Sequence, residues 1–456
     1  MARKKENLTS AERLEEALVP EGEQPYPVPG NWCWMRGRAF LKPMETKRPE
    51  GEVFRYIDID SIDNKRQQVT EPKNLQVKDA PSRASRKLRT GDTVFSMVRP
   101  YLMNIAYIDE TISNSIASTG FYVCTPTENV NSLYLYYLMT SPYTVDGLNR
   151  YMKGDNSPSI RKDDIENYVY PIPPLPEQQR IVNRIESLFA KLDEAKQKAQ
   201  DALDSFEPRK AAILHRAFTG ELTAQWRKEH DVGMESWEEK TINDIGDVKG
   251  GKRIPKGMEL TYENTGHPYL KAGNLKQGTV IASGMMYVTD EILECIKNYT
   301  VSAGDVYITN VGACIGDCGI IPPEYDGANL TENAVKITNL KCNNKWLSYY
   351  LSGSSVQQNI KSMIASATLG KLSIANIKKI ELNIPTSLDE QIEIVCILDN
   401  LFAKEQQAKD AAEGVLEQID LIKKAILARA FRGELGTNDP SEESAQELIK
   451  NFIFKM

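Results

Sequence analysis

The sequence has few of the residues that enzymes use for catalysis. Only three histidines, His215, His230 and His267, occur among its 456 residues, and none has a serine or cysteine nearby in a context typical of a nucleophile. The nearest candidate for an ATP-binding loop, at residues 370–372, lacks the upstream glycine and the hydroxyl residue of a P-loop. We therefore expect a binding subunit rather than an enzyme, with no catalytic residue and no cofactor-binding residue in this chain.

Two further signatures of enzymes are missing. Gly312, Gly316 and Gly319 follow a strand-like segment but do not form the G-x-G-x-x-G of a dinucleotide site, so we interpret them as turn residues. The Pro-Pro pairs at 173–174 and 322–323 lack the preceding Asn or Asp and the following aromatic residue of an amino-methyltransferase. The sequence thus gives no reason to expect methyl transfer by this chain itself.

Long apolar runs and dense cysteine clusters are also absent. No apolar run approaches the roughly 20 residues that span a bilayer, and the charged N-terminus lacks the apolar core of a signal peptide. Seven cysteines without dense spacing fit reduced intracellular thiols. Cys314 and Cys318 suggest a zinc site, but the closely spaced ligand pairs typical of such sites are missing, so we expect no metal. The sequence predicts a cytoplasmic protein without a membrane segment.

The negative charge of the chain is unevenly distributed. The net charge is −7, and residues 387–456 alone carry 8 basic against 14 acidic side chains. The segments 31–170 and 236–386 are close to neutral, with 19 basic against 17 acidic residues and 15 against 15. A nearly neutral domain can still present a basic face, so charge alone neither supports nor excludes nucleic acid as a ligand.

The most informative feature that is present is an internal repeat. Residues Leu175 to Leu222 align with Leu388 to Leu435 after a shift of 213 positions, without a gap, and 23 of these 48 positions are identical. Both copies contain EQ-x-x-IV, then LFAK, then AIL-x-RAF-x-GEL. The same shift aligns a Gly-Asp pair at 91–92 with one at 304–305. A period of this length indicates duplication of a whole domain with its helix, not a solenoid.

The repeat divides the chain into two globular copies and two helical regions. Short strand-like segments broken by Gly, Pro and Asn fill each globular copy, which predicts mixed α/β domains. We expect the following parts: an N-terminal helix and Pro-rich linker (1–30), a first globular domain (31–172), a central helical region (173–235), a second globular domain (236–385), a distal helical region (386–436) and an acidic tail (437–456). The N-terminal helix is expected from about Ser10 to Leu18, with Thr9 or Ser10 as its N-cap.

Both helical regions carry a heptad pattern of apolar residues, which is typical of coiled coils. Each predicted helix has about 30 residues, or about 45 Å at 1.5 Å per residue. Pro208 interrupts the first helix, and Glu405 occupies an expected seam position in the second. The main seam positions are Ile181, Ile185, Leu188, Leu192, Phe206, Ile394, Leu398, Leu401, Val415 and Ile419.

Two equal helices with one domain between them in sequence are expected to pair antiparallel. The predicted fold class is therefore α+β, with two tandem, pseudo-symmetric α/β domains separated by long helices that form an antiparallel coiled coil. The alternative is that each helix packs only on its own domain. The narrow apolar stripe and the charged outer faces favour pairing.

The ordered, duplicated motifs resemble those of type I restriction–modification specificity subunits. The resemblance rests on PLPEQQRIV…LFAKLDEAK…RKAAILHRAFTGELT, on its second copy LDEQIEIV…LFAK…KKAILARAFRGELG, and on the domain motifs LRTGDTVFSMVRP and VSAGDVYITNVG. It extends from Trp32 to Leu435 in the order domain, helix, domain, helix. The second copy departs at Thr386-Ser387, where the first has Pro174.

The resemblance implies a non-catalytic DNA-recognition subunit. Each recognition domain would read one half of a bipartite, asymmetric site in double-stranded DNA, and the paired helices would set the spacer. Two methyltransferase subunits would dock on the helices, and restriction and translocation subunits would join them. S-adenosylmethionine, ATP and Mg²⁺ would belong to these partners.

Candidate DNA contacts are side chains that can grip phosphate or pair with base edges. They cluster around the Gly-Asp turn and in a late loop of the first copy, and in a glycine-rich loop and in turns after strands of the second. In the first copy these are Arg83, Arg86, Lys87, Arg89, Arg99, Tyr101, Asn104, Lys153 and Asn156. In the second they are Lys249, Lys252, Arg253, Lys256, Lys271, Asn274, Asn310 and Lys361.

A second hypothesis remains open at this stage. Two similar heads on a helical framework would also suit a scaffold that displays two protein-binding surfaces and does not contact DNA. Any single charged side chain in the candidate set could equally be a solvated surface residue.

Overall fold

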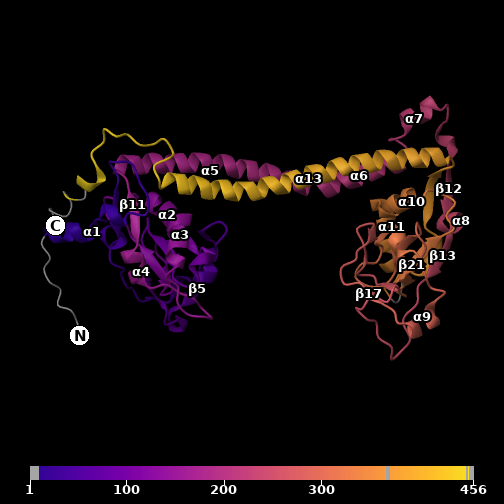
Figure 1. Cartoon of the computed structure of the whole chain (residues 1–456), viewed down its shortest axis with the longest axis horizontal. Coiled ribbons are helices and arrows are strands. Elements are labelled where there is room, and N and C mark those ends of the chain that lie inside the picture. The colour runs from indigo at the N-terminus through magenta and orange to yellow at the C-terminus, as the bar shows by residue number, and fades with distance from the viewer. Residues whose placement is uncertain (1–9, 366–369, 448–449, 451–456) are drawn as a thin grey trace. The chain divides into compact units, whose positions relative to one another are not determined.

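The chain forms two compact units, each built from segments that are distant in sequence. The computed structural model describes residues 10–365, 370–447 and 450 (Figure 1). Unit 1 combines the residues up to 199 with those from 414 onward, and unit 2 consists of residues 200–413. The N-terminal helix α1 (Ser10–Ala17) begins at the first described residue, so the N-cap predicted at Thr9 lies outside the described part of the chain.

The recognition domain of unit 1 consists of short strands and three helices. A four-stranded sheet has the order β5-β2-β9-β6, a three-stranded sheet has the order β10-β7-β8, and β1 pairs with β11. The strands are β1 (Cys33–Arg36), β2 (Val53–Ile57), β3 (Ile62–Asp63), β4 (Gln68–Val69), β5 (Lys73–Gln76), β6 (Ala84–Lys87), β7 (Thr93–Ser96), β8 (Ile105–Tyr107), β9 (Ile116–Ser118), β10 (Phe121–Cys124) and β11 (Val169–Ile172). The helices are α2 (Ser132–Thr140), α3 (Pro142–Asn149) and α4 (Lys162–Asn167).

The recognition domain of unit 2 repeats this architecture. Its strands are β12 (Trp237–Thr241), β13 (Asp247–Gly250), β14 (Pro268–Leu270), β15 (Leu275–Lys276), β16 (Thr279–Val280), β17 (Met286–Tyr287), β18 (Val306–Thr309), β19 (Cys318–Ile320), β20 (Asn329–Leu330), β21 (Ala334–Thr338) and β22 (Glu381–Pro385). Its helices are α7 (Ala224–Glu229), α8 (Ile242–Ile245), α9 (Asp290–Ile296), α10 (Asn344–Ser352), α11 (Ser354–Ala365) and α12 (Ile374–Lys378).

The strand pairings show that the two domains are structural copies. In each unit one parallel pair occurs, β2 with β9 in unit 1 and β14 with β20 in unit 2. A first and a last strand close each domain, β1 with β11 and β12 with β22. The antiparallel pair β7 and β8 corresponds to β18 and β19, and these four strands obey the same shift of 213 residues.

The repeated Gly-Asp pair forms the turn before β7 and before β18. Gly91 has φ +90° and Gly304 has φ +85°, a conformation that glycine adopts without steric cost. The carboxylate of Asp92 accepts a hydrogen bond from the backbone N–H of Arg89 at 2.8 Å, and Asp305 accepts one from the backbone of Ser302 at 2.8 Å. This motif of the repeat therefore shapes a turn in both domains.

Two helices connect the domains in sequence, and a third, long helix follows the second domain. They are α5 (Leu175–Asp204), α6 (Phe206–Phe218) and α13 (Leu388–Ala430). The predicted interruption at Pro208 is found as the break between α5 and α6. Proline is tolerated there because the first turn of a helix lacks intrahelical N–H bonds.

The helices pair antiparallel within each unit, as the heptad pattern predicts. In unit 1, Lys423 of α13 contacts Asp193 of α5 at 2.5 Å, and Asp420 lies 3.7 Å from Lys196. Residue numbers thus rise along α5 while they fall along α13, which means that the two helices run antiparallel. In unit 2, Arg209 of α6 binds Glu405 of α13 at 2.9 Å. The predicted fold class is confirmed, and Glu405 at its seam position has an arginine partner.

The predicted seam residues differ in burial. Ile181, Ile185, Ile394 and Leu398 are fully buried near the starts of the helices, and Ile419 and Phe206 are also buried. Leu188, Leu192 and Leu401 are half-buried. Val415, in contrast, is 41% exposed, so it does not belong to the buried seam.

Within the described residues, no helix combines the length and the apolar character that a membrane crossing requires.

Candidate nucleic-acid interface

The EQ motif of the repeat anchors each long helix to its recognition domain. Gln178 at the start of α5 accepts a hydrogen bond from the backbone N–H of Asn131 at 2.7 Å, and its amide donates to the carbonyl of Pro173. Gln391 at the start of α13 does the same with Asn343 at 2.8 Å and with Pro385. Because Asn131 and Asn343 are the N-caps of α2 and α10, the glutamine fixes the helix relative to the domain core.

The glutamate of the same motif is buried in both units. In unit 1, Glu177 accepts hydrogen bonds from the indole N–H of Trp32 and from the side-chain amide of Asn438, both at 2.8 Å. In unit 2, Glu390 accepts them from Arg227 at 2.7 Å and from Thr223 at 2.8 Å. A buried charge is tolerated only with such partners, so these glutamates hold the segment after one helix against the start of another.

These contacts show that each recognition domain is held by two different helices. The RAF-x-GEL segment at the end of α6 lies against unit 2, where Leu214 and Ala217 belong to the apolar core. The equivalent segment at the end of α13 lies against unit 1, where Phe431 packs on Tyr134 with ring centroids 5.5 Å apart. The alternative in which each helix packs only on its own domain is therefore wrong for the ends of α6 and α13.

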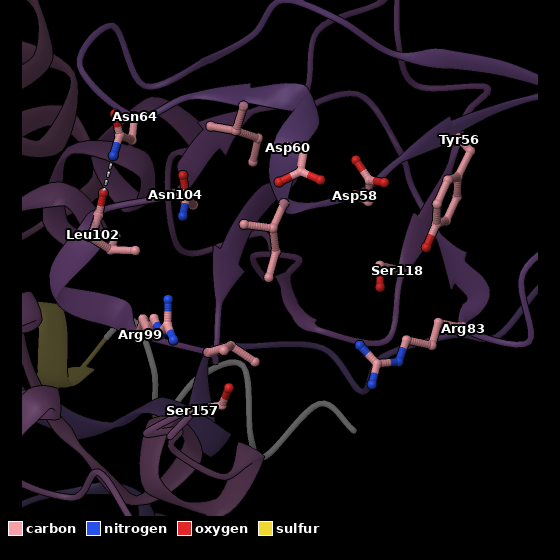
Figure 2. A pocket seen from close by; sticks show the side chains of 13 residues that line it. Tyr56, Asp58, Asp60, Asn64, Arg83, Arg99, Leu102, Asn104, Ser118 and Ser157 are labelled. Atoms are coloured by element: carbon pink, nitrogen blue, oxygen red, sulfur yellow. Dashed lines mark hydrogen bonds between the residues drawn. The ribbon is translucent and has the colours of Figure 1, made fainter. Parts of the chain in front are cut away.

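In the first domain, three predicted contacts line one hollow of about 680 Å³. Arg83 lies just before β6, Arg99 lies in the loop between β7 and β8, and Asn104 ends that loop (Figure 2). The side chain of Arg83 is exposed, and it has no hydrogen-bond or ion-pair partner among the described residues. A free guanidinium of this kind is available to a phosphate or to a guanine.

The late loop of the first domain lies against the same hollow. The backbone N–H of Arg99 donates to the carbonyl of Pro158 at 2.8 Å, and its guanidinium donates to the carbonyl of Asn156 at 2.8 Å. Lys153 pairs with Ser159 in an isolated β-bridge. Residues that are separated in sequence by more than 50 positions thus form one surface, and exposed Tyr101 belongs to the same loop as Arg99.

The rest of the predicted basic cluster does not line the hollow. Lys87 and Arg89 both form ion pairs with Glu45, Lys87 at 2.8 Å. The hydrogen bond from Lys87 lowers the pKa of Glu45 below its usual value. Arg86 is half-buried in β6, and its Nε has no partner among the described residues. The charge of Lys87 and Arg89 is therefore largely compensated, which makes these two residues weaker candidates than Arg83.

Other residues of the hollow were missed from the sequence. Asp58 and Asp60 follow β2 and bring carboxylates into a surface expected to be basic. Asp58 is partly neutralised by Lys73, whose pKa is raised by a hydrogen bond to that carboxylate. Asn64 contributes an amide that donates to the carbonyl of Leu102 at 2.9 Å. The signal was the YIDID segment at the end of a strand, where polar side chains are exposed.

In the second domain, three of the four basic residues predicted in the glycine-rich loop lie there, whereas Lys249 lies in strand β13. Lys249, Lys252, Arg253 and Lys256 are all exposed. Lys249 lies 3.7 Å from Asp247, Lys252 lies over the ring of Tyr299 at 5.5 Å, and Arg253 pairs with Glu332. Lys249 and Arg253 keep 56% and 77% of their side chains exposed in these ion pairs, against 37% and 44% for Lys87 and Arg89, so this region remains a candidate for phosphate contacts.

The remaining predicted residues of the second domain are less suited to the role. Asn274 is 2% exposed, and its amide donates to the carbonyls of Ile281 and Ser283, so it closes a turn and has no free donor. The Oδ1 atom of Asn310 is buried without a partner among the described residues. Lys361 lies on α11, not in a loop, and borders a pocket that residues of α6 also line.

Lys271 is half-buried and lies directly after β14, and its backbone N–H donates to Asn274 at 3.3 Å.

Within the described part of the chain, no group of three or more His, Cys, Asp or Glu residues is arranged to hold a metal ion.

Comparison with known proteins identifies the class. The model of the family described as type I restriction modification DNA specificity domain matches twice, at residues 36–203 and at 234–413. The chain therefore belongs to this family and carries two copies of its domain. Proteins of this class are the non-catalytic DNA-recognition components of type I restriction–modification systems, the family that the repeated motifs resemble.

Individual relatives cover nearly the whole chain. The chain is 23% identical over 444 residues to the type I restriction enzyme EcoKI specificity subunit of Escherichia coli strain K12, covering 91% of this chain and 90% of that protein. It is 22% identical over 439 residues to the StySPI specificity subunit of Salmonella potsdam, covering 92% and 91%.

Solved structures share the fold. A structure titled for complex assembly and conformational transition of the type I R-M system superposes with a TM-score of 0.72 at 25% identity, covering 90% of this chain and all of that one. The HsdS subunit from Thermoanaerobacter tengcongensis superposes with a TM-score of 0.65 at 24% identity, covering 90% and 99%.

Proposed function

We propose that this chain gives a type I restriction–modification complex its DNA sequence specificity by reading a bipartite, asymmetric site. Each recognition domain would bind one half of the site in double-stranded DNA. The observation that carries this proposal is the loop between two paired strands that both domains share. It joins β7 to β8 in the first domain and β18 to β19 in the second, with equal length.

The loop closes with the same backbone hydrogen bond in both domains but carries different side chains. Ser96 donates its N–H to the carbonyl of Asn104 in the first domain, and Thr309 donates its N–H to that of Asp317 in the second. The shift of 213 residues places Gly312 opposite Arg99 and Asp317 opposite Asn104. Arginine and asparagine pair with guanine and adenine, whereas aspartate accepts from cytosine. Two loops of equal length that carry different side chains suit a DNA site whose two halves differ in sequence.

The paired helices would set the spacer between the half-sites. Half-site separation follows from the distance between reading elements when these are held rigidly. The buried anchors at Glu177 and Glu390 support rigidity, because each domain is fixed to two helices and not to one flexible linker.

The identical residues of the two helical regions would serve partner docking as well as pairing. Two methyltransferase subunits would bind the repeated helical surfaces, and restriction and translocation subunits would join the assembly. S-adenosylmethionine, ATP and Mg²⁺ would then act on those partners. Such a complex would work in the cytoplasm, where it meets DNA.

Mapping of DNA methylation tests the proposal. The chain is co-expressed with its methyltransferase partner in cells that lack other modification, and methylated positions are mapped by sequencing. We expect one split, non-palindromic motif with a fixed gap. Copurification with the partner but methylation without sequence preference would instead support a scaffold that does not read DNA.

A further inference from the structure

The hollow of the first domain has the lining of a nucleic-acid site. Its volume of about 680 Å³ falls within the roughly 300–1,000 Å³ of organic ligand sites, but such sites are mostly apolar. Nine of the thirteen residues that line this hollow are polar, and two are arginines. Two aspartates balance the two arginines, so a ligand with many hydrogen-bonding groups fits this lining better than an apolar small molecule.

Asn104 is the unusual member of this lining. It is 6% exposed, and its backbone carbonyl accepts a hydrogen bond from Ser96 at 3.1 Å. Its side-chain amide borders the hollow (Figure 2) and has no hydrogen-bond partner among the described residues. The residue as a whole is buried, but its amide faces the hollow, so the donor and the acceptor of the amide are free to pair with a ligand that enters there.

The loop that carries Asn104 is held in place before any ligand binds. Arg99 and Met103 have φ values of +47° and +56°, and the turn between them is the 3₁₀ helix Pro100–Leu102. The amide of Asn64 donates to the carbonyl of Leu102, and the guanidinium of Arg99 donates to that of Asn156. Left-handed backbone at residues other than glycine persists only when the surroundings enforce it.

We infer that Asn104 reads the major-groove edge of an adenine in the half-site bound by the first domain. This inference rests on the function proposed above. An asparagine amide presents one donor and one acceptor in a plane, which match N7 and the N6 amino group of adenine. Guanine offers two acceptors at the same edge and lacks the complementary donor.

The charges around the hollow agree with a base edge at its centre. The carboxylate of Asp60 lies 3.9 Å from the amine of Lys73 but is 87% exposed, so it disfavours a phosphate beside it. Arg83 borders the hollow without a partner of its own and is free to grip the DNA backbone. Arg83 would thus position the DNA through a phosphate, and Asn104 would select the base.

Functional-group replacement in the DNA tests this assignment. The full chain in complex with its methyltransferase partner is bound to duplexes that carry its methylated motif. Each adenine of the motif is replaced in turn by 7-deazaadenine, which lacks the N7 acceptor. For one adenine in one half-site, we expect binding about tenfold weaker, the effect of leaving a buried donor unpaired.

The variant Asn104→Leu, which has nearly the same side-chain volume, should bind the unmodified duplex more weakly and show no further loss at that one adenine. Its sensitivity in the other half-site should stay intact, which shows that the variant is folded. Asn104→Asp, which replaces the donor with a second acceptor and adds a negative charge, should also show no further loss at that adenine. Asn114→Leu on the exposed surface of the same domain should match the wild type.

If 7-deazaadenine weakens wild type and both Asn104 variants equally at every position, or weakens the wild type at none, Asn104 is not the reader. The function proposed above fails separately, through the absence of any split motif in the methylation map of the wild type.

Discussion

At the residue scale, the structure separates basic side chains that are free from those that are already paired. Arg83 lines the hollow of the first domain without a partner among the described residues, whereas Arg89 is bound to Glu45. The sequence places both in one cluster around the Gly-Asp turn, because spacing alone does not show where an acidic partner from residue 45 will lie. The difference is a matter of tertiary contact.

Arg83→Ala should weaken DNA binding by the assembled complex and lower the salt dependence of the affinity. Each phosphate contact that is lost reduces the slope of log K against log salt concentration by about 0.9. Arg89→Ala is the matched control, since its charge is compensated, and it should change the slope less. Fluorescence anisotropy at several salt concentrations gives both slopes. Equal slopes for wild type and Arg83→Ala would remove Arg83 from the interface.

Other residues show where sequence reasoning reaches its limit. Asn274 lies in a turn after a strand, which made it a candidate DNA contact. In the structure, however, its amide donates hydrogen bonds to the carbonyls of Ile281 and Ser283. The sequence did not identify Asp58 and Asp60 as residues of the site, because carboxylates are not expected at a surface that binds phosphate. Hydrogen-bond partners from distant segments decide both cases.

At the scale of elements, the long helices were predictable and the small sheets were not. The heptad seam and the repeated motifs predicted the helices and their antiparallel pairing, and Pro208 predicted the break in the first helix. The docking of α6 on the second domain, through Leu214 and Ala217, follows from tertiary packing and has no local signal. Strands of two to five residues gave little periodicity, so the sheet order was not predicted.

The buried anchor of α13 should be worth far more stability than an exposed ion pair between the helices. Arg227 and Glu390 have side chains that are 8% and 1% exposed, whereas Arg209 and Glu405 are 41% and 28% exposed. Arg227→Met leaves a buried carboxylate without its cation and should destabilise unit 2 by about 3–5 kcal/mol. Arg209→Met should cost about 1 kcal/mol or less.

Hydrogen exchange of the backbone amides in α7 and the first turns of α13 measures this difference. Loss of protection in Arg227→Met, with near-normal protection in Arg209→Met, is the expected result. Similar protection in both variants would mean that Thr223 and Trp237 alone satisfy the buried glutamate.

At the scale of the whole molecule, duplication explains why one chain can read two unlike sequences. The two domains share strand pairings, the Gly-Asp turn and the EQ anchor, while the loop residues at Asn104 and Asp317 differ. The shared parts were evident from the repeat itself. The reading residues could not be assigned from it, because only the structure shows which side chains meet in one hollow.

The measurement that tests the account most directly is a methylation map for a chain with lengthened helices. One heptad is inserted into α5 and one into α13 at facing levels, which adds about 10.5 Å at 1.5 Å per residue. We predict that both half-sites keep their sequences and that the gap between them widens by about three base pairs, at 3.4 Å per base pair. A map in which the gap stays the same while the half-site sequences change would contradict the account.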